Sequence, residues 1–195
     1  MLPALEYGYC GVELMGIFSR ERKLSAEEIN QCMDWLDIHY RITTFQEKEA
    51  DLYNNALVKL GNDLTTDKLS GVGMLQAAKR LADASQEMVA RTNYIKFVPE
   101  PASRAHLLWM IVFSDYMMWA TAQYAAIQAL IHGRNPIGER VVELFKKSEE
   151  STKQALKAEK KLLEHMHKNG FTVNDLHRLN ANAAEAIAQD KWLPS

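Results

Sequence analysis

The sequence predicts an all-α protein, an up-down-up-down bundle of four long helices with short additional helices at the N- and C-termini. Three observations lead to this prediction: one long apolar stretch, helix start and stop signals at regular intervals, and no strand pattern. Long helices of similar length joined by short connectors pack antiparallel. With 195 residues, 47% of them apolar, the chain can build one sizeable core, so we expect a single domain over residues 1–195.

Residues 107–131, which read LLWMIVFSDYMMWATAQYAAIQALI, are the centre of this prediction. The stretch is long enough to span a bilayer, but Asp115 lies near its middle, and a central Asp costs about 3 kcal/mol on insertion. We therefore expect a buried helix of a bundle and no stable transmembrane span. Because this helix is apolar on most sides, it needs cover from other segments of the chain or from a second copy.

The first half of the chain contains three predicted segments. Residues 1–23 are expected to form a short helix, over 1–18, and a charged connector; this helix is the first candidate cover. Ser25 and Glu28 have the spacing of a capping box, so a long helix begins at residue 26 and is stopped by Gly-Asn-Asp at 61–63. A second helix, capped by Thr65 or Thr66, is predicted to end near Phe97.

The second half follows the same logic. Pro99 and Pro101 end the second helix and open the buried one, and Asn135 with Pro136 opens a fourth that ends at residue 168. Residues 25–169 thus form the predicted four-helix core, with helices of roughly 32 to 36 residues and thus about 50 Å long. Thr172 caps a last helix within residues 172–190, which is the second candidate cover.

Counting residues from the helix midpoints predicts a polar layer halfway along the bundle. In this layer Asp115 faces His39, and small hydroxyl side chains complete the hydrogen bonds. Its members are expected at heights along the bundle axis that agree to within roughly 6 Å. They are His39, Ser85, Asp115 and either Ser151 or Thr152. Gln46 and Glu49 are expected a turn or two away, near Ser148. The candidate ligand-binding residues are therefore His39, Gln46, Glu49 and Asp115.

Two interpretations of this layer stay open. Buried polar pairs can fix the register of helices, as a polar core residue does in a coiled coil, and this is the favoured reading. The layer can also be a small-ligand, metal or proton-handling site, since bundle interiors host those. Independent of the layer, the Lys/Glu run over residues 146–161 is predicted to be a solvated face, not a binding patch.

Known site motifs give little support for chemistry. A ferritin-like di-iron site needs two Glu-x-x-His pairs, and the chain has one, Glu164 with His167, so no metal or cofactor is expected. Cys10 and Cys32 lack the spacing of a zinc motif or a disulfide framework. No catalytic constellation is present, so an enzyme is the less favoured class.

The charge balance limits the partners. A net charge of −2 and a last helix with a single Arg argue against nucleic acid. The N-terminus lacks the basic region of a signal peptide, which together with the unpaired cysteines predicts a cytoplasmic protein.

The function predicted from these observations is that of a non-enzymatic helical bundle that acts through self-association or by binding a protein partner. Two alternatives remain. One is a small-ligand or metal-binding bundle with a polar mid-core site. The other is a membrane-active bundle that exposes residues 107–131 on contact with lipid.

Overall fold

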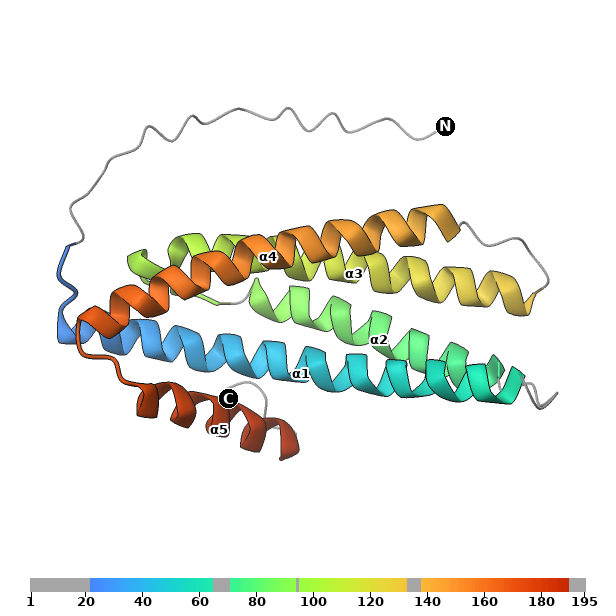
Figure 1. The fold of residues 1–195 in the computed structure, drawn as a ribbon, viewed down its shortest axis with the longest axis horizontal. Helices are drawn as coiled ribbons and strands as arrows, with labels where there is room; N and C mark the ends of the chain where they lie inside the picture. Colours follow the sequence, from blue (N-terminus) through green and yellow to red (C-terminus); the bar gives the residue numbers. More distant parts are fainter. Residues whose placement is uncertain (1–21, 65–70, 94, 133–137, 190–195) are drawn as a thin grey trace, which may run out of the picture.

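The protein is all-helical, as the sequence predicts (Figure 1). The computed structural model describes residues 22–64, 71–93, 95–132 and 138–189, and none of these residues is in a strand. The elements are α1 (Ala26–Leu64), α2 (Gly71–Thr92), η1 (Glu100–Ala102), α3 (Ser103–Ile131), α4 (Gly138–Lys168) and α5 (Val173–Ala188). The predicted N-terminal helix over residues 1–18 lies outside the described residues.

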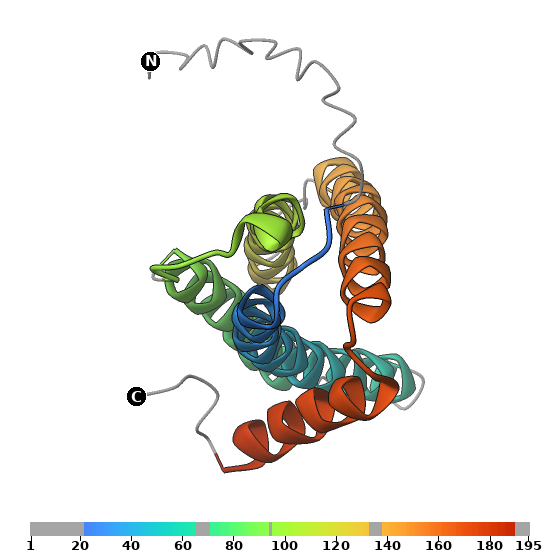
Figure 2. The ribbon, with the colours of Figure 1, turned by 90° about the vertical axis from the view of Figure 1, so that its left-hand side faces the viewer.

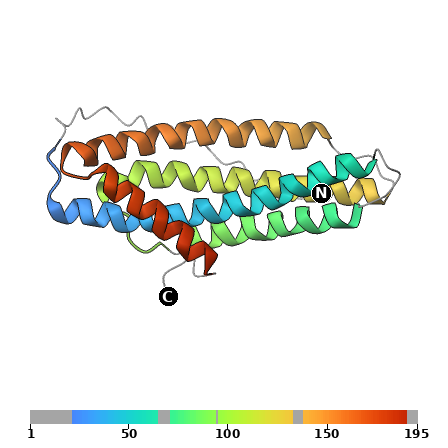
Figure 3. The same ribbon diagram turned by 60° about the horizontal axis from the view of Figure 1, so that its bottom comes forward.

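The four longer helices lie side by side, and consecutive ones run in opposite directions (Figure 1). The backbones approach closely between α1 and α2, between α2 and α3, and between α3 and α4. The short helix α5 packs on α1, on the side away from α3 (Figures 2 and 3). Between α1 and α4, by contrast, the connection is made by long side chains, and these form the site described below.

Three local signals position the helix ends. Ser25 and Glu28 form the predicted capping box, in which Ser25 Oγ accepts from the Glu28 N–H and the Glu28 carboxylate accepts from the Ser25 N–H. Thr172 forms a second capping box with Asp175 at the start of α5. Gly170, with a φ of 109°, ends α4 in the left-handed region that glycine tolerates.

The predicted equal helix lengths are wrong, because α1 to α4 have 39, 22, 29 and 31 residues. Helix α1 continues through Gly61, whose cost of about 1 kcal/mol in a helix does not stop it. Helix α2 ends at Thr92 and not near Phe97. The chain before Pro99 is not helical, consistent with the clash that disfavours the α conformation at Val98.

The core has two parts. The larger one joins α1, α3, α4 and α5, with Met88 of α2 at its edge, and includes Trp35, Trp109 and Phe113. The smaller one lies between α1, α2 and α3 around Tyr53 and Leu81. Three small residues of α2 are also buried, namely Ala78, Ser85 and Thr92.

The sequence leaves two ways to cover residues 107–131, other segments of the chain or a second copy, and the described segments do not cover this helix on every side. Leu107, Ile111 and Met118 of α3 are 61%, 44% and 38% exposed. Helix α5, one of the two candidate covers, packs on α1 instead. The described residues therefore leave an outer face of α3 uncovered.

Candidate functional site

A buried carboxylate, Glu159 of α4, is the centre of the polar interior. It is 8% exposed, and three side chains from two other helices reach it. His39 Nε2 lies 3.2 Å from Oε2, Trp109 Nε1 donates to the same oxygen at 2.8 Å, and the Tyr40 hydroxyl donates to Oε1 at 3.1 Å. Glu159 thus connects α4 to both α1 and α3.

The electrostatics of this cluster keep Glu159 ionised. Burial by itself raises the pKa of the Glu159 carboxyl, but hydrogen bonds and charge from His39, with hydrogen bonds from Trp109 and Tyr40, outweigh it and lower the pKa below the usual 4.5. The pKa of Tyr40 is raised, first by burial and then by the neighbouring Glu159 charge. At neutral pH the cluster therefore consists of a carboxylate with a neutral phenol and an indole as donors.

Aromatic rings enclose His39. The Trp35 ring stacks on it with a centroid distance of 5.1 Å and an interplanar angle of 3°, and the Trp109 ring lies 4.7 Å away. Trp35 Nε1 in turn donates to His106 Nδ1 at 3.3 Å. Burial, and to a lesser extent His39, lowers the pKa of His106, which keeps its ring neutral and able to accept. The imidazole of His39 is fixed on both sides and held against Glu159.

The predicted pairing of Asp115 with His39 is wrong. Asp115 is buried as expected, but its Oδ1 pairs with Lys147 Nζ at 2.9 Å, and Lys147 reaches it from the surface with a side chain that is 60% exposed. Its Oδ2 is buried and has no hydrogen-bond partner among the described residues. His39 meets α3 at Trp109 and Phe113, so Asp115, two residues after Phe113, lies on a different side of that helix.

The other two predicted site residues have partners of their own. Glu49 is buried in α1, and the Arg80 guanidinium of α2 donates to both of its oxygens, with Nη2 2.7 Å from Oε1. Gln46 lies beside Tyr116: burial raises the pKa of that phenol to about 12, and a hydrogen bond with Gln46 offsets part of the rise. His39, Gln46, Glu49 and Asp115 therefore take part in four separate interactions.

The sequence does not indicate Glu159 as a site residue, because Glu159 lies within the Lys/Glu run that predicts a solvated face. That prediction is wrong at this one position, although the pattern of α4 contains the signal. Glu159 belongs to a row at alternating spacings of four and three residues, in which every side chain is buried or half-buried: Ser148, Thr152, Ala155, Glu159, Leu162 and Met166. The row, and not the charge of its neighbours, determines which way Glu159 points.

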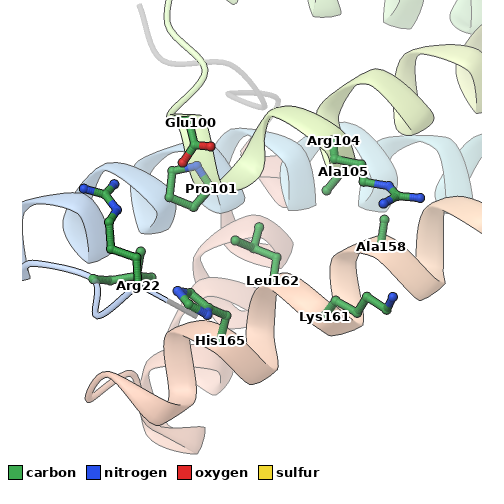
Figure 4. A pocket seen from close by; sticks show the side chains of 10 residues that line it. Arg22, Glu100, Pro101, Arg104, Ala105, Ala158, Lys161, Leu162 and His165 are labelled. Carbon is green, nitrogen blue, oxygen red and sulfur yellow. The ribbon is translucent and has the colours of Figure 1, made fainter. Parts of the chain in front are cut away.

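A pocket of about 510 Å³ opens next to this cluster, between the start of α3 and the end of α4 (Figure 4). Ala105 and Ala158, which line it, precede His106 and Glu159 in the chain. Its described wall has nitrogen-bearing side chains from Arg22, Arg104, Lys161 and His165, and one carboxylate, from Glu100.

Metal chemistry has no support in the described part of the chain, where no group of three or more His, Cys, Asp or Glu side chains is arranged to hold an ion. Cys32 is buried as a free thiol, and burial, followed by the charges of Glu28 and Glu100, raises its pKa to about 11. Cys10 lies outside the described residues.

Among the described helices, none combines the length and the apolar character needed to cross a membrane.

Comparisons of the chain with models of protein families, with curated proteins and with solved structures returned no match.

Proposed function

We propose that this protein is a non-enzymatic association module that pairs with a second copy of itself through the outer face of α3. One observation carries the proposal. Between Leu107 and Ile131, Asp115 is the one residue of a charged type, and it is buried and paired with Lys147. The exposed face of α3 is therefore uncharged over 25 residues, about 37 Å of helix.

The pattern on this face suits another helix. Exposed or half-buried residues follow one another at alternating spacings of four and three: Leu107, Ile111, Ser114, Met118, Thr121 and Ala125. This is the spacing of a coiled-coil seam, in which side chains of one helix insert between those of its partner. We call these six residues the α3 seam.

A second copy is the occupant that the chemistry of the α3 seam favours. The seam has no charge with which to select a charged partner, whereas an identical seam matches it in polarity. Ser114 and Thr121 are small enough to let two helices approach, and their hydroxyls can exchange hydrogen bonds across a two-fold axis. Monomeric proteins rarely expose a long contiguous apolar patch, which supports an interface here.

We further infer that residues 25–169 act as one up-down-up-down core, which presents the seam on a rigid support. The alternating helix directions in Figure 1 and the contacts of His39 and Tyr40 with Glu159 support this arrangement. These contacts lie inside the molecule, and the described residues leave the outer face of α3 uncovered.

Sedimentation velocity of three proteins tests the proposal. Ile111→Glu places a charge in the seam, and Val173→Glu places the same charge at an exposed site, 59% accessible, at the start of α5. We expect the wild type and Val173→Glu to sediment as dimers, and Ile111→Glu to sediment as a monomer with unchanged circular dichroism. A wild-type monomer, or a dimer that persists in Ile111→Glu, would contradict the proposal.

A further inference from the structure

We propose that the pocket between the start of α3 and the end of α4 binds a small amphipathic oxyanion, that is, a phosphate or carboxylate group carrying a short apolar chain. This site is additional to the α3 seam, and its occupancy does not depend on association. The volume of about 510 Å³ is in the range of sites for small organic molecules.

Two cations define the polar part of this pocket. Arg104 of α3 and Lys161 of α4 extend in the same direction on either side of Ala158 (Figure 4). Neither forms an ion pair with another described residue, in contrast to Lys160, which pairs with Glu164, and to Arg178, which pairs with Asp175. Two unpaired cations on facing helices can hold one oxyanion between them.

The rest of the wall is consistent with a negatively charged ligand. Arg22 also lines the pocket but is already paired with Glu28, and the imidazole of His165 adds ring nitrogens to the wall. Among the described residues of the lining, Glu100 is the one acidic side chain, so cations outnumber carboxylates there. Because α3 begins at Ser103 on the same wall, its dipole adds to the positive potential that Arg104 and Lys161 create.

The apolar residues at the base of the pocket indicate that the bound anion carries an apolar portion. Leu24, Ala105 and Leu162 are 5%, 2% and 5% exposed and belong to the main core, and Pro101 lies beside them. An inorganic ion would leave this surface in water, whereas an alkyl chain would cover it and gain free energy from its burial. The chemistry of the pocket therefore fits an amphipathic anion better than free phosphate.

Isothermal titration of the full chain with three probes tests this proposal: n-octyl phosphate below its micellar concentration, octanoate, and inorganic phosphate. We expect at least one of the octyl anions to bind at one per chain, about tenfold or more tightly than inorganic phosphate. Its affinity should fall by about tenfold or more in Arg104→Ala and in Lys161→Ala, since each removes a charge-assisted contact.

Two matched variants serve as controls. Lys160→Ala and Arg178→Ala remove the same side-chain types from exposed positions outside the pocket and should leave the affinity unchanged. Ala158→Phe fills the pocket without changing a charge, and it should abolish binding while the circular dichroism spectrum stays that of the wild type.

Three results would overturn the proposal. The first is the absence of saturable binding of both octyl anions at millimolar concentration. The second is an equal loss of affinity in the control variants. The third is binding to vesicles that contain phosphatidic acid without binding of monomeric octyl phosphate, which would indicate a lipid surface and not a pocket for one free ligand.

Discussion

His39 and Glu159, which are 120 positions apart in the chain, form the buried contact that joins α1 to α4, with Nε2 3.2 Å from Oε2. Tyr40, the neighbour of His39, binds the other carboxylate oxygen. A carboxylate is tolerated in the core here because donors from two helices satisfy it. The stability of the molecule should therefore depend on Glu159 far more than on the other acids of α4.

Glu159→Ala is expected to lower the free energy of unfolding by about 3 kcal/mol, because it leaves the buried donors of Trp109, Tyr40 and His39 without an acceptor. Glu164→Ala removes an exposed glutamate from the same helix and should change it by less than about 0.5 kcal/mol. Urea unfolding followed by circular dichroism measures both. Equal effects of the two substitutions would show that the Glu159 cluster stabilises the fold no more than an exposed glutamate does.

Acid should weaken the fold through the same carboxylate. The pKa of Glu159 is lower in the folded protein than its unfolded value of 4.5, so its contribution is complete above that pH and is lost as the pH falls through the folded pKa. We expect the unfolding free energy of the wild type to fall below about pH 4.5, and Glu159→Gln to show a smaller fall. Parallel pH profiles of the two proteins would contradict this account.

Double-mutant cycles distinguish the observed pairing of His39 from the one predicted by sequence. His39→Ala combined with Glu159→Gln should give a coupling energy of about 1 kcal/mol or more. His39→Ala combined with Asp115→Asn should be additive to within about 0.5 kcal/mol, since Asp115 has Lys147 as its partner. Strong coupling in the second cycle would restore the sequence-based pairing and argue against the structure.

Lys147 should matter more than its exposure suggests. Lys147→Ala leaves the buried Asp115 carboxylate without its cation, and we expect the free energy of unfolding to fall by about 1 kcal/mol. The effect is limited because solvent surrounds the exposed ammonium group. Lys146→Ala, an exposed neighbour, should have no measurable effect. Because Asp115→Asn removes the buried charge, the double variant with Lys147→Ala should recover most of the loss; a larger loss in the double variant would refute the role assigned to the pair.

The sequence predicts the parts of this fold that depend on neighbouring residues. The capping box at Ser25 and the helix cap at Thr172 are local, because each rests on backbone groups within a few positions.

The site is harder to predict because it depends on how helices rotate against each other. Equal helix lengths placed His39 level with Asp115, but His39 contacts the side of α3 that carries Trp109 and Phe113, and Asp115 lies on a different side. Helix α4 turns Glu159 inward, so the buried acid that meets His39 is a different one. A helix wheel of α4 would have found Glu159 in the row of Ala155 and Leu162. The face of α3 that the described residues leave uncovered could not be predicted, because the apolar content of a helix does not say where the covering segments pack.

The most direct test of the central proposal is the native mass of the full wild-type chain at several micromolar concentrations. If the α3 seam pairs with a second copy, the mass should be twice the 22.2 kDa of one chain, and the fraction of monomer should rise on dilution. A mass of 22.2 kDa at every concentration would contradict self-association, and the uncharged face of α3 would then need another explanation.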